Sequence, residues 1–373
     1  MHISLKCITF ARRKYIMLYQ WLISLPMMVC FFWAVFFAVR AFEYGKDPCL
    51  NTTILLFFVA ATVLYTDHWL YFSEVKTFLG LWTYLVANLC VYPLYYAYLR
   101  ALTHSEKSIA VLLFLIPAAV IFILFPLNAR FGWLDGEYML FFVRICFAFE
   151  VVWVWWRGTR LLRKTRARLD DTYSDDRGHL LHPTLIIQHL LGITAAISML
   201  LNFLGRDFFA ESMMVTIPAI LMSVLLFAIG YVADRTRLPQ EIIKTDYLGD
   251  EQTVLNEESE LLMQRIDTLM RDGQLYTNPA LNIVDLATAV GSNRTYVSNA
   301  INRTYNINFS QYIAQLRVEA AKNMLADPGY MTDKEAIADA IALSGFSSDQ
   351  TFYRVFKELT GVTPLQYRHN SLH

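Results

Sequence analysis

Two short stretches near the C-terminal end of the chain carry hydrogen-bonding side chains at helical spacing. In the first, polar residues recur every three or four positions around the apolar Val297 and Ile301, so they share the outer face of a helix. These outer residues are Arg294, Thr295, Ser298, Asn299, Asn302 and Arg303. Amide, hydroxyl and guanidinium groups in such a row can hydrogen-bond to base edges and phosphates in a DNA groove.

The second stretch repeats this arrangement further along the chain. Its apolar positions, which we expect to point inward, are Phe352, Val355, Phe356 and Leu359. The positions left on the outer face are Gln350, Thr351, Tyr353, Arg354 and Lys357. Each stretch is therefore a candidate for a helix that contacts DNA.

A further helix and a turn precede each of these stretches. The first pair of helices covers residues 282–290 and 294–305, with a break at Gly291 and a possible cap at Ser292 or Asn293. The second pair covers 333–344 and 348–360, with a turn at Gly345-Phe346. A long helix over 309–326 separates the two pairs. This order predicts two helix-turn-helix units joined by one scaffold helix.

On these residues the chain resembles the AraC/XylS family of bacterial transcription activators. The stretches that match are LATAVGSNRTYVSNAINRTYNINFSQYIAQLRVEAAKNML and, more specifically, SGFSSDQTFYRVFKELTGVTPLQYR. The resemblance covers about residues 275–369 and says nothing about the preceding part of the chain. It implies a domain of seven helices, whose long middle helix holds two recognition helices about one DNA turn apart.

The resemblance also implies roles for individual residues. Base-edge contacts would fall at Thr295, Ser298, Asn299, Gln350, Thr351 and Arg354. Phosphate contacts would fall at Arg294, Arg303 and Lys357. Arg317 and Arg368 also match family positions, and we expect these two to brace the fold. Double-stranded DNA is thus the partner that the resemblance implies.

The charge of this region departs from that of most DNA-binding domains. Residues 280–373 contain eight basic and eight acidic side chains, so the two sets cancel. Phosphate neutralisation usually requires a basic excess, and we therefore expect a single copy to bind weakly and with strong salt dependence. Confinement to a membrane and pairing into a homodimer would raise the effective concentration.

The first 235 residues have a different composition. The whole chain is 56% hydrophobic with a mean hydropathy of +0.36, and the apolar excess lies before about Arg235. We find seven apolar runs long enough to cross about 30 Å of hydrocarbon. They are residues 18–39, 52–72, 79–99, 109–126, 138–156, 185–204 and 213–233. A lipid bilayer is therefore the second expected partner.

A basic segment indicates the orientation of these spans. We expect a loop after the fifth span, which carries Arg157, Arg160, Arg163, Lys164, Arg166 and Arg168. Basic groups next to a membrane end favour the cytoplasmic side, and two further spans return the chain to that side. The C-terminal domain would then lie in the cytoplasm, below the bacterial cytoplasmic (inner) membrane.

The same count places the N-terminus outside, against the preference of four basic residues there. These are Lys6, Arg12, Arg13 and Lys14. Three explanations stay open: one span fewer, charges that are overridden, or a true start at Met17.

Four ionisable residues fall inside predicted spans, where such groups are costly and usually face a bundle interior or a cavity. They are Asp67, His68, Arg144 and Glu150. In one interpretation Asp67 and Arg144 line an outward-open sensing pocket for a small-molecule ligand or a membrane protein partner. In the other they form a structural ion pair, among interhelical hydrogen-bonding residues that are Asn88, Gln188, His189 and Asn202.

The sequence predicts an all-α chain of three parts. A seven-helix transmembrane bundle fills residues 1–235, a linker and connecting helix 236–274, and a seven-helix AraC-type double helix-turn-helix domain 275–373. No nucleophile–base set, phosphate loop or metal-ligand spacing stands out, so we expect no enzyme, no cofactor and no metal site. The expected function is a membrane-embedded one-component transcription regulator that couples a membrane or extracytoplasmic signal to promoter binding. The alternative is a membrane receptor whose helical tail binds protein partners.

Overall fold

The structure is a computed structural model in which every element is a helix. It describes residues 2–42, 48–103, 113–133, 135–174, 177–204, 215–236 and 256–372. No strand occurs within these ranges, so the predicted all-α fold is confirmed. The chain divides into two compact units, Met1–Arg163 with His182–Gln240, and Lys164–Leu181 with Glu241–His373.

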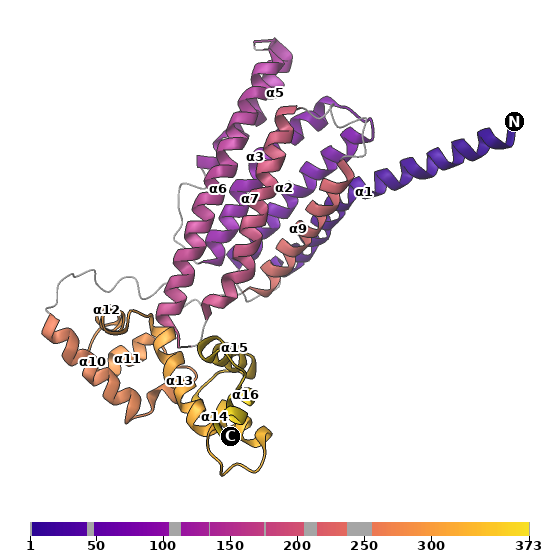
Figure 1. Cartoon of the computed structure of the whole chain (residues 1–373). Helices are drawn as coiled ribbons and strands as arrows, with labels where there is room; N and C mark the ends of the chain where they lie inside the picture. The colour runs from indigo at the N-terminus through magenta and orange to yellow at the C-terminus, as the bar shows by residue number, and fades with distance from the viewer. Residues whose placement is uncertain are drawn as a thin grey trace. The chain divides into compact units, whose positions relative to one another are not determined.

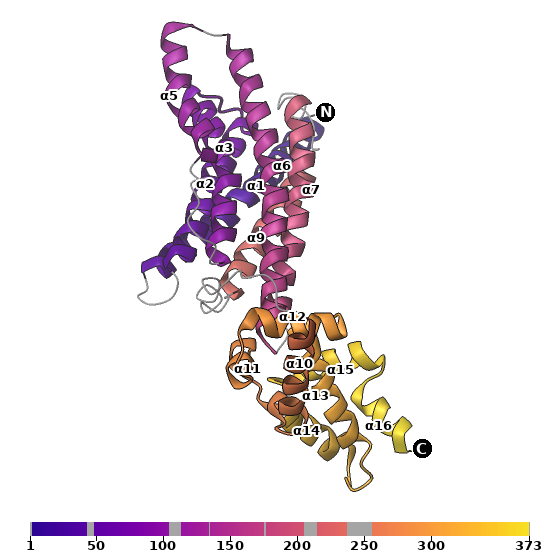
Figure 2. The ribbon, with the colours of Figure 1, turned by 90° about the vertical axis from the view of Figure 1, so that its left-hand side faces the viewer.

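The first unit is a bundle of apolar helices (Figures 1 and 2). They are α1 (His2–Phe42), α2 (Pro48–Phe72), α3 (Phe78–Leu102), α5 (Ile116–Phe131), α6 (Gly136–Thr172, up to Arg163), α7 (His182–Leu204) and α9 (Thr216–Arg235). Each of the seven predicted apolar runs overlaps one of these helices, although residues 109–112 and 213–214 of two runs lie outside the described residues. Six are long and apolar enough to cross a membrane, whereas α5 has only 16 described residues. The count of seven crossings therefore stays a prediction.

Apolar side chains cover the outside of the first unit as well as its interior. Phe37, Phe57 and Phe58 are buried, and the ring of Phe58 stacks on Phe37 and meets Phe57 edge-to-face. Phe31, Phe149 and other large apolar residues point outward. A soluble surface of this kind would be unusual, because large exposed apolar areas mark contact with lipid or protein. The unit has the composition of a membrane domain inside and out.

A polar link joins α6 and α7 within this bundle, as the sequence predicts for Gln188. Its side-chain amide donates to the carbonyls of Val154 and Trp155, both at 3.2 Å. Asn202 is predicted to act in the same way, but its side chain is not among those that the structure describes.

The basic segment after the fifth apolar run is helical, so the predicted loop at this place is wrong. Helix α6 continues without a break through Arg163 and Arg168 to Thr172. Arg, Lys, Leu and Ala are strong helix formers, and an i,i+4 pair between Arg166 and Asp170 supports the last turns. Charge alone therefore does not distinguish a loop from a helix at this place, because basic residues are common in both.

The second unit consists of short amphipathic helices. They are α10 (Asn256–Arg271), η4 (Leu275–Thr277), α11 (Ile283–Ala289), α12 (Arg294–Tyr305), α13 (Phe309–Leu325), α14 (Asp333–Ser344), α15 (Asp349–Thr360) and α16 (Pro364–Leu372), with the end of α6 and η1 (Arg177–Leu181). Helix α13 lies between the α10–α12 group and the α14–α16 group (Figure 1). It contributes Phe309 and Ile313 to one apolar core, and Val318 and Leu325 to the other.

Helix α10 belongs to the first of these cores, although the sequence pattern places it in the connector. Met263, Ile266 and Met270 of α10 pack with Leu286 and Ile301. Its Asp267 also accepts hydrogen bonds from the hydroxyls of Tyr312 at 2.7 Å and Tyr305 at 3.0 Å. Burial, followed by the hydrogen bond to Asp267, raises the pKa of Tyr312, so this hydroxyl stays a donor at neutral pH.

Candidate nucleic-acid interface

Helices α11 and α12 form the first helix-turn-helix unit. Asn282 caps α11 by accepting from the backbone amides of Val284 and Asp285, at 2.9 and 3.1 Å. The turn uses Gly291 at a positive φ of 67°, where a side chain is unfavourable. Asn293, rather than Ser292, caps α12 through a 3.0 Å bond from the amide of Tyr296. These local signals are all readable in the sequence, and the bounds of α12 match the prediction.

The outer face of α12 carries the predicted polar residues. Val297, Ala300 and Ile301 are buried in the domain core. On the opposite face the exposed side chains are Thr295, Asn299, Asn302 and Arg303, and the half-buried ones are Arg294 and Ser298. The helix therefore offers a continuous polar row that a DNA groove could receive.

Helices α14 and α15 form the second helix-turn-helix unit. Gly345 ends α14 at a φ of 89°, and Ser348 caps α15 by accepting from the amide of Thr351 at 3.2 Å. Phe352, Val355 and Phe356 are buried as predicted, but Leu359 is 45% exposed. The prediction that Leu359 points inward is wrong, because the core on this side is closed by α16, whose Tyr367 packs on Phe356.

Two of the predicted contact residues in α15 already have partners. The hydroxyl of Thr351 lies 2.9 Å from the Ser348 hydroxyl in the cap, and Arg354 pairs with Glu358 one turn later, at 3.4 Å. Gln350, Tyr353 and Lys357 are exposed on the same helix. A DNA contact of Arg354, as the sequence predicts it, would therefore require the exchange of an intrahelical carboxylate for a base or a phosphate. An exposed pair of this kind is weak, so the exchange costs little.

Arg368 holds the helices around the second helix-turn-helix unit together, as expected for a residue that braces the fold. It is almost fully buried, and its guanidinium donates to the carbonyls of Leu325, Asp327 and Tyr330 at 3.0–3.1 Å and to the carboxylate of Asp333 at 2.9 Å. These bonds tie α16 to the end of α13 and the start of α14. Arg368 is thus not available to a phosphate.

The ion pair at Asp333 leads to a prediction on pH. Hydrogen bonds from His369 and Arg368 lower the pKa of Asp333 below its usual range. A lowered pKa stabilises the fold at pH values above the unfolded pKa of about 3.9, and this stability is lost as the pH falls through the folded pKa. We therefore expect pepsin to cut within α14–α16 increasingly fast below about pH 4. Peptide mapping by mass spectrometry would measure this.

The Asp333→Asn variant should flatten that pH dependence, since an amide carries no charge to lose. Glu335→Gln, which changes a carboxylate on the same helix, should keep the wild-type profile. If Asp333→Asn chains were cut with the same steep acid dependence as the wild type, the assignment of the effect to Asp333 would be wrong.

Arg317, on α13 between the two helix-turn-helix units, is the second bracing residue and is only 1% exposed. Its Nε donates to the carbonyl of Tyr276 and its Nη2 to that of Asn278, both at 2.8 Å. Its Nη1 donates to the carbonyl of Ser174 at 3.3 Å, and Nη2 to the Ser174 hydroxyl at 3.1 Å. The expectation that Arg317 serves the fold is consistent with this geometry, but its partner Ser174 was not foreseen.

Ser174 belongs to a segment that follows α6 directly and lies within the second unit. The amide of Ser174 donates to the carbonyl of Leu281 at 3.1 Å, and Tyr173 forms an antiparallel bridge with Asn282. Leu169, Tyr173 and Ser174 are buried. The sequence signal is three uncharged residues, Thr172, Tyr173 and Ser174, between two pairs of aspartates, which is too weak to predict docking.

The four predicted sensing residues lie in the first unit, Asp67 and His68 on α2 and Arg144 and Glu150 on α6, and their role in sensing stays a prediction. Asp67 is buried and accepts a 2.7 Å hydrogen bond from Thr83, and His68 stacks against Tyr65 and Phe72. Arg144 is half-buried. Glu150 is buried, and neither of its carboxylate oxygens has a hydrogen-bond partner among the described residues. Of the four, His68 alone lines the cavity discussed below.

Comparison with known proteins supports the C-terminal assignment. Residues 286–370 match the family model described as a helix-turn-helix domain. The melibiose operon regulatory protein of Escherichia coli K12 is 35% identical over 89 residues, which are 24% of this chain and 28% of that protein. An HTH-type transcriptional regulator of Staphylococcus aureus (strain MSSA476) is 33% identical over 95 residues, 26% of this chain and 12% of that protein. The regulator YtdP of Bacillus subtilis is 33% identical over 88 residues, 24% of this chain and 11% of that protein.

These likenesses cover less than a third of each relative's length and leave the first unit of this chain unmatched. No solved structure matches the chain. Within the matched range, the fold and the comparisons define a helix-turn-helix DNA-binding region. More narrowly, the two helix-turn-helix units joined by α13 resemble part of transcription regulators such as the melibiose operon regulatory protein, and the N-terminal helices have the lengths and composition of a membrane domain.

Proposed function

We propose that the protein is a membrane-embedded, one-component transcription regulator of the bacterial cytoplasmic membrane. The observation that carries the proposal is the presence in one chain of six membrane-length apolar helices and an AraC-type double helix-turn-helix region. DNA binding requires the second unit to lie in the cytoplasm, on the side that the basic segment of α6 also favours.

In this proposal α12 and α15 enter successive major grooves of one face of the DNA. Base contacts come from Thr295, Ser298, Asn299, Gln350, Thr351 and Arg354, with Asn302 and Tyr353 beside them, and phosphate contacts from Arg294, Arg303 and Lys357. The exposure of these outer faces and the buried arginine brace on α13 support this arrangement, because α13 fixes the spacing between the two helices.

Signal transfer is proposed to run along α6. This helix begins in the first unit, and the segment that follows it supplies Ser174 to Arg317 on α13. A signal that shifts or rotates α6 would therefore act on the residue that holds the scaffold helix. Such a route needs two arrangements of one element whose populations the signal changes.

The test uses the full chain in lipid nanodiscs and an unbiased selection from random DNA duplexes at low ionic strength. We expect a preferred sequence with two half-sites about one DNA turn apart. Gln350→Ala and Arg354→Ala should each weaken binding to that sequence by about tenfold to a hundredfold, as for the loss of a base contact. Band shifts or fluorescence anisotropy would give the affinities.

Lys334→Ala is the charge control for this experiment, because Lys334 is exposed on α14 outside the recognition helices. Its effect should stay within about twofold, the size expected of a distant charge in salt. If no duplex is preferred, and regulation in cells survives Gln350→Ala and Arg354→Ala, the receptor whose tail binds protein partners becomes the better description. The balanced charge of residues 280–373 is the observation that favours this alternative, because DNA binding usually requires a basic excess.

A further inference from the structure

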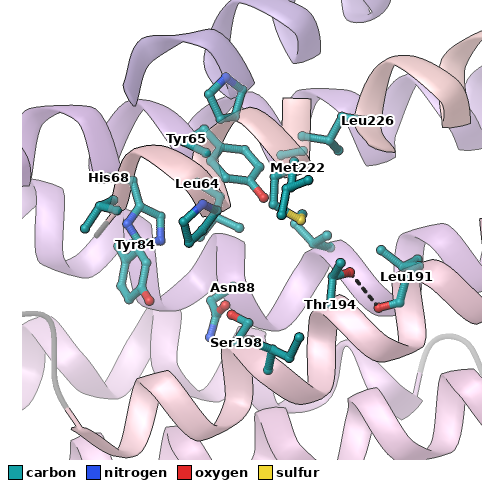
Figure 3. Close-up of a pocket in the computed structure, with 18 of the residues that line it drawn as sticks. Leu64, Tyr65, His68, Tyr84, Asn88, Leu191, Thr194, Ser198, Met222 and Leu226 are labelled. Carbon is teal, nitrogen blue, oxygen red and sulfur yellow. Dashed lines mark hydrogen bonds between the residues drawn. The ribbon is translucent and has the colours of Figure 1, made fainter. Parts of the chain in front are cut away.

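A cavity of about 420 Å³ lies inside the first unit (Figure 3). Side chains of α1, α2, α3, α6, α7 and α9 line it, so residues far apart in the sequence border one space, which is partly open. The volume is within the range of cavities that hold drug-sized ligands. Of the four predicted sensing residues only His68 lines it, and Asp67 and Arg144 do not.

The lining selects against charged molecules. Aromatic and aliphatic side chains dominate, among them Tyr65, Tyr92, Phe147 and Met222. None of the described lining residues carries a carboxylate, an ammonium or a guanidinium group. Apart from the imidazole of His68, the described lining offers no group that carries a charge near neutral pH, so a charged ligand would lose its hydration with little compensation, which is expensive in an apolar site.

One buried polar atom of a lining residue has no hydrogen-bond partner among the described residues. Asn88 on α3 is only 6% exposed, and its Nδ2 has no hydrogen-bond partner among the residues that the structure describes. By contrast, the Thr194 hydroxyl on α7 donates to the carbonyls of Leu190 and Leu191, both at 3.0 Å (the bond to Leu191 is dashed in Figure 3). An unpaired buried amide is costly unless a partner arrives.

We propose that this cavity binds an uncharged, mainly apolar small molecule with one hydrogen-bond acceptor, such as an aromatic ketone, and that Asn88 Nδ2 donates to that acceptor. The proposal rests on the proposed function, in which a molecule bound here is the signal. The aromatic walls supply the contact area, and the single amide fixes the orientation of the ligand.

Benzophenone is a suitable probe, because it is neutral, carries one carbonyl acceptor and, when irradiated, couples to nearby C–H bonds, methionine above all. The full chain in nanodiscs offers two methionines for comparison: Met222 lines the cavity, and Met28 is 42% exposed on the outside of α1. We expect saturable labelling of Met222 and non-saturating labelling of Met28 from probe dissolved in the lipid. Mass spectrometry of the peptides gives the ratio.

The Asn88→Leu variant should lower the labelling of Met222 by about tenfold and leave Met28 unchanged, as expected for the loss of one buried hydrogen bond. The same variant should unfold at the same or a higher temperature without the probe, because it removes an unpaired polar group. Asn51→Leu is the matched control: Asn51 is a buried asparagine on α2 outside the cavity, and its Nδ2 donates to the carbonyl of Arg40. Its Met222 labelling should equal that of the wild type.

Ala219→Phe is a second test, since Ala219 lines the cavity and a larger side chain would fill it. It should abolish labelling of Met222 alone. Equal labelling of Met222 in the wild type and in Asn88→Leu would overturn the proposal, as would an unlabelled Met222 beside a labelled Met28, which is the result if a lipid chain fills the cavity. Neither result touches the proposed function, which the DNA selection on the same preparations tests separately.

Discussion

Replacing Gly345 by alanine is expected to destabilise the second unit far more than the same change at Gly291. Both glycines form the turn of a helix-turn-helix unit, and both have positive φ, 89° and 67° respectively. A Cβ at Gly345 would lie 2.6 Å from the Cα and from the carbonyl oxygen of Thr277, whereas a Cβ at Gly291 would have nothing within 4 Å. Backbone atoms of η4 cannot move aside as a flexible side chain could.

The expected losses of stability in the two variants follow from two separate costs. A left-handed conformation costs a non-glycine residue about 1–2 kcal/mol, and Gly291→Ala should lose only that amount. Gly345→Ala adds a backbone clash, for which overpacking costs of about 1–3 kcal/mol are usual. Hydrogen exchange of the α14 and α15 amides, measured on the full chain in nanodiscs, reports the opening free energy. Equal losses in the two variants would show that the contact between Gly345 and Thr277 is not tight.

The local structure of the second unit could be predicted because its signals are local. The helix over 294–305 is bounded by an asparagine cap and begins after a glycine turn, and 333–344 ends at Gly345. Caps, turn glycines and the spacing of apolar residues act within a few positions, so they are visible in the chain itself. The exposure of Leu359 could not be predicted in this way, since it depends on where α16 packs.

What the sequence did not predict depends on contacts across long separations. Arg317 and Ser174 are 143 positions apart, and nothing near either residue indicates the other. The unpaired amide of Asn88 likewise becomes visible only when six helices enclose the cavity. Asn88 was expected to bond across helices, an expectation that holds for Gln188. A hydrophobic run predicts that a helix is buried in lipid or protein but not which neighbours it meets.

The second large effect is expected at Arg317. Arg317→Met keeps much of the apolar stem but removes every donor, so the carbonyls of Tyr276, Asn278 and Ser174 each lose a partner in a buried place. Breaking a buried charged network by removing one member typically costs about 3–5 kcal/mol. We expect a loss of this order in the opening free energy of α13, measured by hydrogen exchange in nanodiscs.

Ser174→Ala separates the parts of this network. It deletes only the hydroxyl that accepts from Arg317 Nη2 and leaves the Ser174 carbonyl in place, so about 1 kcal/mol should be lost. Arg317→Lys should behave nearly as badly as Arg317→Met, because an ammonium group cannot reach carbonyls in three directions as the guanidinium fork does. Arg303→Met, on the exposed face of α12, is the control and should leave the stability almost unchanged.

These variants also distinguish a brace from a DNA contact. If Arg317 contacted phosphate, its loss would weaken DNA binding and reduce the salt dependence of the affinity while the fold kept its stability. If it is the brace that its bonds indicate, stability falls first, and the amide of Ser174 exchanges faster because its docking on Leu281 depends on the same cluster. DNA affinity would then fall together with stability, since α13 no longer fixes the spacing of α12 and α15. A stable Arg317→Met chain with a protected Ser174 amide would therefore rule out both the brace and the proposed route through α6.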